Sequence, residues 1–279
     1  VIFNWQGGEP LLRGLEFYQK AVSYQRKYAR PGMKITNTLQ TNGTLLDDQW
    51  CQFFRQNEFL IGISIDGPQE LHDTYRVDRR GRASFERVTA GLELLKKHRV
   101  EYNILATVHA ANAGHPLDVY RFFRDKLGVQ FIQFIPIVER QHSSDSQGSR
   151  AVTEHSVSAE QYGSFLVAIF DEWVRQDVGK MFVQIFDVSL GAWLGQPGGL
   201  CIFAPTCGMG LAMEHNGDLY ACDHFVEPEF LLGNIKGENL LRLVASQQQR
   251  QFGIDKQDTL PTYCQKCKVR FACHGGCPK

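Results

Sequence analysis

The sequence has no apolar run long enough to cross a lipid bilayer, and its start at Val1 is not a charged and then apolar leader. It also has no excess of charge, because 30 Lys and Arg residues balance 30 Asp and Glu residues. We therefore expect no membrane segment and no polybasic face for nucleic acid. A cytoplasmic location follows, and a chain rich in reduced thiols agrees with that compartment.

Glycine-rich loops of the dinucleotide-binding and P-loop types are absent as well, since none follows an expected strand. The chain instead alternates strands with helices, which predicts βαβ units and a parallel sheet. Five strands before residue 140 favour a barrel or part-barrel, with a doubly wound open sheet as the alternative. The expected strands are 1–5, 34–40, 59–65, 101–108, 130–137 and 181–185, and the main expected helices are 15–28, 84–98, 116–127 and 158–176.

Local signals predict where several elements begin and end. Asp47 suits a helix N-terminus, and Ser84 is expected to cap the helix that follows it. Asn216-Gly217 is a strong hairpin-turn signal. We expect an exposed loop at 141–155, a helix at 238–251, and a domain boundary at the glycine-rich stretch after residue 195.

Seven of the eight cysteines lie between Cys201 and the C-terminus, in two groups. The first group is Cys201, Cys207 and Cys222; the second is Cys264, Cys267, Cys273 and Cys277, spaced CxxCxxxxxCxxxC. Closely spaced thiols can converge on one soft metal centre. The remaining thiol, Cys51, is expected to be an ordinary buried residue on a helix.

Three interpretations compete for the seven thiols. Disulfides are disfavoured, because the chain shows no secretory leader and is long enough to build a core without them. Structural zinc suits the last four cysteines, but it explains the first three only if His224 or His274 completes their site. Iron-sulfur ligation accommodates all seven and is preferred.

Polar residues follow the expected strands, where a parallel βα fold collects its chemistry. Gln6-Gly7-Gly8-Glu9 follows the first strand, Asn42 follows the second, and Ser64 ends the third. Two adjacent glycines allow close approach of a ligand, although such a segment is as often only a turn. Asp223 directly follows a cysteine and suits a general base, although most aspartates are surface or capping residues.

These segments, taken together with the cysteine array, resemble the anaerobic sulfatase-maturating enzymes, which are radical S-adenosylmethionine (SAM) proteins with a C-terminal SPASM domain. The resemblance runs from Val1 to Lys279 and implies an α/β fold. The barrel would be a partial (β/α)6 radical SAM barrel lacking its first βα unit, in residues 1–195. The small cysteine-rich SPASM domain would occupy residues 196–279. The segments are Gln6–Pro10, Leu39–Thr44, Ser64–Gly67 and Phe134–Arg140.

The resemblance also implies roles for single residues. Asp223 matches the catalytic base, and Gln6 matches a residue that contacts substrate. The SAM-binding positions are Gly7, Gly8, Glu9, Asn42, Ser64, Arg76 and Ile137. The ligands of one auxiliary 4Fe-4S cluster are Cys201, Cys207, Cys222 and Cys277, and three ligands of a second are Cys264, Cys267 and Cys273.

The implied reaction is radical SAM oxidation of a Cys or Ser in a sulfatase polypeptide to Cα-formylglycine, with flavodoxin or ferredoxin as electron donor. Two departures from the family pattern are expected to matter. The sequence has no CxxxCxxC motif for the radical SAM cluster, and no cysteine follows Cys277. We expect a fragment that is unable to cleave SAM by itself. The alternatives are a SPASM enzyme that modifies ribosomal peptides and a non-catalytic zinc or iron-sulfur module that binds polypeptide.

Overall fold

The computed structural model describes residues 1–141, 152–196 and 199–279. They form two compact units, Val1–Gln184 and Ile185–Lys279. The boundary expected after residue 195 lies within the second unit and stays a prediction. Most of the loop expected at 141–155 lies outside the described residues. In the ranges described, no helix is long and apolar enough to cross a membrane.

The first unit is built on one parallel sheet of six strands whose order in space follows their order in the chain. A doubly wound sheet reverses its direction of growth at a switch point, so this order excludes it. The predicted part-barrel is confirmed. The strands are β1 (Ile2–Trp5), β2 (Thr36–Thr41), β3 (Leu60–Ser64), β4 (Glu101–Val108), β5 (Phe131–Pro136) and β6 (Phe182–Val183). The last strand is shorter than expected because helix α7 (Gln184–Trp193) begins directly after it.

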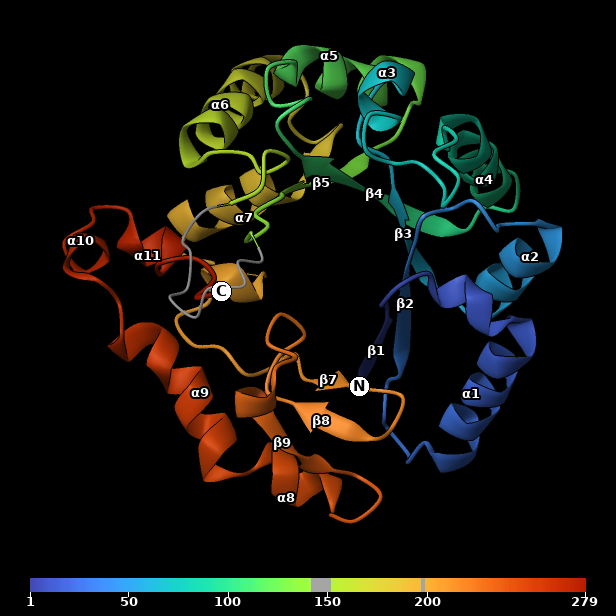
Figure 1. The fold of residues 1–279 in the computed structure, drawn as a ribbon, viewed down its shortest axis with the longest axis vertical. Helices are drawn as coiled ribbons and strands as arrows, with labels where there is room; N and C mark the ends of the chain where they lie inside the picture. Colours follow the sequence, from blue (N-terminus) through green and yellow to red (C-terminus); the bar gives the residue numbers. More distant parts are fainter. Residues whose placement is uncertain (142–151, 197–198) are drawn as a thin grey trace. The chain divides into compact units, whose positions relative to one another are not determined.

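Helices follow the strands and lie in an arc along one side of the curved sheet (Figure 1). They are α1 (Leu15–Tyr28), α2 (Asp48–Gln56), α3 (Gln69–His72), α4 (Phe85–Lys97), α5 (Pro116–Arg121) and α6 (Ala159–Gln176). One π-helical segment (Phe122–Lys126) continues α5. Ser158 begins α6 with a capping box that it forms with Gln161.

The core beneath these helices is strongly aromatic. Tyr18 of α1 contacts Trp50 of α2, and Phe54 of α2 contacts Phe59 at the start of β3, with ring centroids 5.6 Å and 5.3 Å apart. Such edge and tilted pairs add to the free energy of simple burial. Cys51 lies in this core with none of its surface exposed, and burial raises the pKa of its thiol to about 12. Its expected role as a buried apolar residue is confirmed.

Ser84 occupies the first position before α4, but its side chain does not cap that helix. The Asp73 carboxylate accepts hydrogen bonds from the backbone N–H groups of Ser84 and Phe85, at 2.9 Å and 3.0 Å. The Ser84 hydroxyl instead donates to the carbonyl of Arg76, at 2.6 Å. The expectation that Ser84 caps the helix is therefore wrong, because a carboxylate from the preceding loop takes the acceptor role.

The second unit contains a small antiparallel sheet of β7 (Ala212–Met213), β8 (Asp218–Tyr220) and β9 (Leu231–Asn234). The turn at Asn216-Gly217 joins β7 to β8 as predicted, and Gly217 has a φ of 95°. The prediction of one continuous helix at 238–251 is wrong. This segment forms two helices, α8 (Leu240–Val244) and α9 (Gln247–Asp258), because Ser246 starts a new helix by accepting from the Gln249 N–H. Helices α10 (Thr262–Gln265) and α11 (Arg270–Cys273) follow.

Candidate functional site

The face of the sheet opposite the buried aliphatic residues carries polar side chains. Residues in register on neighbouring parallel strands point to the same side. Thr38 of β2 donates to Asn4 of β1 at 2.6 Å, and Gln40 of β2 donates to Ser64 of β3 at 2.9 Å. Gly62 makes room for the second contact, since a Cβ there would lie 2.0 Å from the Gln40 amide oxygen. This row places Ser64 at the carboxyl end of the sheet with a fixed hydroxyl.

Glu9 joins the turn after β1 to the end of β2. Its Oε1 accepts from the Leu11 N–H at 3.0 Å and from the Thr41 hydroxyl at 2.8 Å, and its Oε2 accepts from the Asn42 N–H at 2.8 Å. Gly7 and Gly8 have φ values of 99° and 53°, and a Cβ on either would meet no atom within 4 Å. The turn therefore needs glycine for its backbone conformation, and the space beside it is open.

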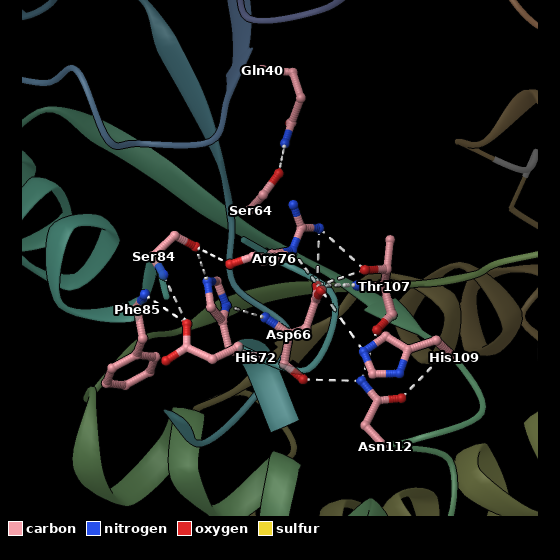
Figure 2. Close-up of polar contacts among 11 residues, drawn as sticks. Gln40, Ser64, Asp66, His72, Arg76, Ser84, Phe85, Thr107, His109 and Asn112 are labelled. Carbon is pink, nitrogen blue, oxygen red and sulfur yellow. Dashed lines mark hydrogen bonds and ion pairs between the residues drawn. The ribbon is translucent and has the colours of Figure 1, made fainter. Parts of the chain in front are cut away.

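Arg76 and Asp66 form a buried ion pair at the end of β3 (Figure 2). The guanidinium donates from Nε and Nη2 to the two carboxylate oxygens, at 2.5 Å and 3.0 Å. Asp66 also accepts from the Thr107 N–H and hydroxyl, at 2.8 Å and 2.6 Å. Within the described part of the chain, Nη1 of Arg76 makes no hydrogen bond. The pair therefore fixes the guanidinium while leaving one of its nitrogens available.

Asn112 binds the turn after β3 to the end of β4. Its amide donates to the carbonyls of Asp66 and Thr107, at 3.1 Å and 2.8 Å, and its oxygen accepts from the His109 N–H at 2.8 Å. The His109 ring is fully buried and lies edge-on to the Tyr75 ring, with centroids 4.7 Å apart. Neither of its ring nitrogens has a hydrogen-bond partner among the described residues, and burial lowers the pKa of His109. We therefore infer a neutral imidazole there.

His72 contacts the same turn and lies between Ser84 and Asp66 (Figure 2). Its Nδ1 accepts from the Asp66 N–H at 3.3 Å, and its Nε2 lies 3.1 Å from the Ser84 hydroxyl. The Ser84 proton is used in the bond to the Arg76 carbonyl, so Nε2 must donate. A second ring proton would face the Asp66 N–H, and burial lowers the pKa of His72 to about 4.

We expect His72 to make the first unit less stable in acid. The unfolded chain binds this proton near pH 6.5 and the folded chain only near pH 4, so the contribution is present above pH 6.5 and is lost as the pH falls toward 4. The loss is about 3 kcal/mol in the free energy of unfolding. The charges of Asp66 and Asp73 raise this pKa, whereas the charge of Arg76 lowers it further. Denaturant unfolding as a function of pH should show a smaller slope for His72→Gln. An unchanged slope would contradict the assignment.

The remaining predicted positions in this unit are Ile137 and Gln6. Ile137 follows β5, where its N–H donates to the Val108 carbonyl and its own carbonyl accepts from Val157, at 2.9 Å and 3.0 Å. Gln6 is exposed in the turn after β1. The Asn42 side chain accepts from the N–H and hydroxyl of Thr44. All the predicted SAM positions thus lie at the end of a strand or in the segment that follows it, except Arg76, which comes from the loop after α3 and contacts Asp66 and Thr107.

Four thiols of the second unit are electrostatic neighbours. Burial raises the pKa of Cys207, the charge of Lys256 opposes this shift, and Cys277 and Cys201 add to it. Burial raises the pKa of Cys222 to about 12, with a smaller contribution from Cys277. These are the four cysteines matched to one auxiliary cluster. A chain reversal through three residues with positive φ, His274, Gly275 and Gly276, precedes Cys277.

The other three cysteines lie close to one another along the chain. Cys264 belongs to α10, Cys267 follows it in a turn closed by a 3.2 Å backbone hydrogen bond, and Cys273 ends α11. All eight cysteines are free, so the disulfide alternative is not supported. In the part of the chain that the structure describes, no three Cys, His, Asp or Glu side chains are close enough to hold one metal ion.

Asp223 follows Cys222 directly, and its carboxylate accepts from the Cys222 thiol at 3.3 Å. The side chain is exposed. On the other side of this segment, His224 Nδ1 lies 3.8 Å from the Cys277 sulfur. Asp223 therefore lies beside Cys222, and the next residue, His224, lies beside Cys277.

Several residues of these sites were not singled out in the sequence. Thr107 lies near the end of β4 and His109 directly follows the strand, so the strand-end argument applied to β4 would have found them. Asn112 lies in a loop with no distinctive pattern. Gln249 and Lys256 are polar residues on a helix, which normally indicates a solvated face.

Comparisons with known proteins agree with both units. Residues 1–123 match the radical SAM superfamily, and residues 201–268 match the iron-sulfur cluster-binding SPASM domain. The solved structure of native anSMEcpe with bound AdoMet and Kp18Cys peptide is 35% identical, with a TM-score of 0.89 over 99% of this chain and 75% of that one.

Two curated relatives extend the match. The cysteine-type anaerobic sulfatase-maturating enzyme of Clostridium perfringens (strain 13 / Type A) is 35% identical, with 99% of this chain and 73% of that protein aligned. The serine-type enzyme of Bacteroides thetaiotaomicron is 52% identical, with all of this chain and 69% of that protein aligned. The chain thus spans about 70% of the length of these relatives. With such identity over its entire length, it belongs to the family of anaerobic sulfatase-maturating enzymes.

Proposed function

We propose that this chain serves in the oxidation of a Cys or Ser side chain of a sulfatase polypeptide to Cα-formylglycine. The observation that carries the proposal is the contact between the Asp223 carboxylate and the Cys222 thiol. Oxidation of CH2–OH to an aldehyde removes a hydrogen atom, a proton and an electron. A base directly beside an iron-sulfur ligand can accept the proton close to the acceptor of the electron.

The strand ends have the donor and acceptor groups that SAM needs. A carboxylate has about four acceptor positions, and Glu9 uses three of them within the chain, so Oε2 keeps one for an ammonium group. Nη1 of Arg76 and the Ser64 hydroxyl suit a carboxylate. Gly7 and Gly8 leave open space beside Glu9. Asn42 and Ile137 would line the pocket, and Gln6 would contact the peptide.

The cysteines suit clusters better than a single ion. Zinc at about 2.3 Å from each sulfur would bring the sulfurs to within about 4 Å of one another. The described residues contain no such group, although Cys201, Cys207, Cys222 and Cys277 interact electrostatically. We assign these four to one auxiliary 4Fe-4S cluster. Cys264, Cys267 and Cys273 would contribute to a second.

The bound cofactors supply a radical that takes hydrogen from the substrate Cβ and an acceptor for the remaining electron. Asp223 takes the proton from the hydroxyl or thiol. A Ser substrate then becomes the aldehyde directly; a Cys substrate becomes a thioaldehyde, which water converts to the aldehyde with release of hydrogen sulfide. Glu9 and Arg76 hold the two ends of the amino-acid group of SAM. A flavodoxin or ferredoxin would supply the electron that SAM cleavage consumes.

The proposal is tested first by anaerobic reconstitution with iron and sulfide. We expect the chain to take up iron and sulfide in equal amounts, and we expect Cys222→Ala to lose the share that belongs to one four-iron cluster. Cys51→Ala is the matched control, because this thiol is buried in the core of the other unit, and it should keep the wild-type iron content. Zinc uptake without sulfide would contradict the cluster assignment.

The substrate is tested in the holoenzyme with two sulfatase peptides that differ only in Cys or Ser at the target position. Formation of an aldehyde, trapped as a hydrazone and located by mass spectrometry, is the expected product. A thioether or carbon-carbon crosslink in place of an aldehyde would favour the ribosomal-peptide alternative. SAM cleavage by the holoenzyme without any change in either peptide would count against both.

A further inference from the structure

Helix α9 (Gln247–Asp258) buries polar side chains where a helix normally buries apolar ones. Gln249 and Lys256 are 5% and 3% exposed, and Gly253 between them is also buried. The spacing of four and then three residues puts all three on one face of the helix. Buried Lys and Gln side chains are costly unless they are paired, so their partners indicate the role of this face of the helix. The Nζ of Lys256 and the Nε2 of Gln249 have partners, whereas the Gln249 Oε1 has none among the described residues.

Lys256 is paired with the segment that contains Cys201. Its ammonium group donates to the carbonyls of Cys201, Ile202 and Ala204, at 2.9 Å, 2.9 Å and 2.6 Å. These three bonds use every donor of the group. They hold a short 3-10 helix (Cys201–Phe203) by its carbonyl oxygens and leave the Cys201 side chain free.

Gln249 is paired with the segments that contain the next two cysteines. Its Nε2 donates to the carbonyl of Gly208 at 2.8 Å and to the carbonyl of Ala221 at 3.1 Å. Gly208 follows Cys207 in the chain, and Ala221 precedes Cys222. One amide group therefore joins two residues that have 12 residues of hairpin sequence between them.

Gly253 lets the Cys207 segment lie directly on the helix. Its carbonyl accepts from the Cys207 N–H at 3.0 Å, and a Cβ at this position would lie 2.8 Å from the Cys207 carbonyl oxygen. A side chain is therefore excluded here by backbone atoms that have little freedom to move. The three buried residues of α9 thus contact the backbone beside all three cysteines of the first group.

We propose that α9 is a positioning template for the auxiliary cluster, in which Gln249, Gly253 and Lys256 hold the Cys201, Cys207 and Cys222 segments in the ligand-binding arrangement. This inference rests on the cluster assignment of the proposed function, not on the identity of the peptide product. Every contact is made to backbone atoms, so all three sulfurs stay available for iron. Mutation of groups that orient metal ligands in this way typically weakens metal binding by about 10- to 100-fold.

Lys256 also adds a positive charge beside the ligands. Its ammonium group donates to the backbone carbonyl of Cys201, one of the assigned ligands, at 2.9 Å. A fixed positive charge stabilises the reduced form of a cluster, because reduction adds negative charge. The positive charge of Lys256 therefore makes this cluster a better electron acceptor. The proposed oxidation of substrate needs such an acceptor, because it releases one electron at the site.

The test compares Gln249→Leu and Lys256→Met with two exposed controls in the same unit, Gln247→Leu and Lys236→Met. The four variants are reconstituted with iron and sulfide. The iron that is missing from reconstituted Cys222→Ala identifies the part of the total iron that belongs to this cluster. We expect iron in this cluster to be lost to a chelator at least about tenfold faster in the two template variants. The controls should match the wild type.

The midpoint potential separates a positioning role from a general loss of stability. EPR-monitored redox titration should show a lower potential for Lys256→Met and a potential near that of the wild type for Lys256→Arg, which keeps the charge. Gln249→Leu should lose iron faster with little change in potential, because it removes no charge. If Lys256→Met does not fold, Lys256→Arg and Gln249→Leu still decide the question.

Two outcomes would overturn the inference. Wild-type iron retention in Gln249→Leu together with an unchanged potential in Lys256→Met would mean that α9 is only a structural helix. A wild-type chain that binds no iron and sulfide would remove the cluster assignment and the template with it. Failure to form formylglycine, with iron retention and potential changed as expected, would overturn the proposed product and leave the template standing.

Discussion

Replacing Asp223 with Asn is expected to slow formylglycine formation by about 10²- to 10⁴-fold, the usual contribution of a general base. The amide keeps the shape of the side chain but has no oxygen that can take up a proton. The Asp223 carboxylate accepts from the Cys222 thiol in this structure. A thiol that becomes an iron ligand loses its proton, so this particular donor to Asp223 is absent from the cluster-bound form.

The measurement is the rate of aldehyde formation in the holoenzyme, with iron content and SAM affinity determined on the same samples. Both should stay at the wild-type level, because Asn does not remove a ligand. Asp258→Asn, an exposed aspartate at the end of α9, is the matched control and should leave the rate unchanged. Wild-type turnover in Asp223→Asn would remove this residue from the mechanism, and a parallel loss of iron would assign it to cluster binding instead.

Asp66→Asn is expected to lower the free energy of unfolding by about 3 kcal/mol. Removing one partner of a buried ion pair leaves the other charge without compensation, at a cost of about 3 to 5 kcal/mol. The lower value applies because the Arg76 side chain is 26% exposed whereas that of Asp66 is 2% exposed. The substitution also removes one acceptor for the N–H and hydroxyl of Thr107.

The same variant should bind SAM about tenfold more weakly. Without Asp66, the Arg76 guanidinium is no longer fixed in position, and SAM binding loses about one charge-assisted hydrogen bond. Denaturant unfolding measures the first effect, and titration calorimetry under conditions where the variant is folded measures the second. Asp118→Asn is the control, because this carboxylate is 70% exposed and should change stability by no more than about 0.5 kcal/mol. Full SAM affinity in a folded Asp66→Asn protein would show that Arg76 needs no such support.

The fold of the first unit follows closely from local patterns. The helix expected at 15–28 and the strand expected at 101–108 have the observed bounds of α1 and β4. Apolar residues such as Leu39, Ile63 and Ile104 recur with the period of a strand and are buried under the helices. Sequential strand order then follows from short right-handed βαβ connections.

The candidate sites were less visible because their supporting residues contact backbone atoms far away in the chain. Asp66 binds Thr107 from 41 positions away, and Lys256 binds the Cys201 carbonyl from 55 positions away. No pattern of spacing marks such pairs. The cap of α4 could not be predicted for the same reason. Ser84 is a favourable cap residue by type, but the acceptor comes from Asp73, 11 positions earlier in the chain.

By itself, the sequence determined the alternation of strands and helices, the hairpin at Asn216-Gly217 and the identity of the residues able to bind iron. These depend on periodicity and on the chemistry of single side chains, which act over a few neighbouring positions. Only the tertiary structure decided that Arg76 is held by Asp66 and that Lys256 faces inward from α9. Burial makes such polar side chains costly unless their partners are in place, and those partners are brought together only by the folded chain.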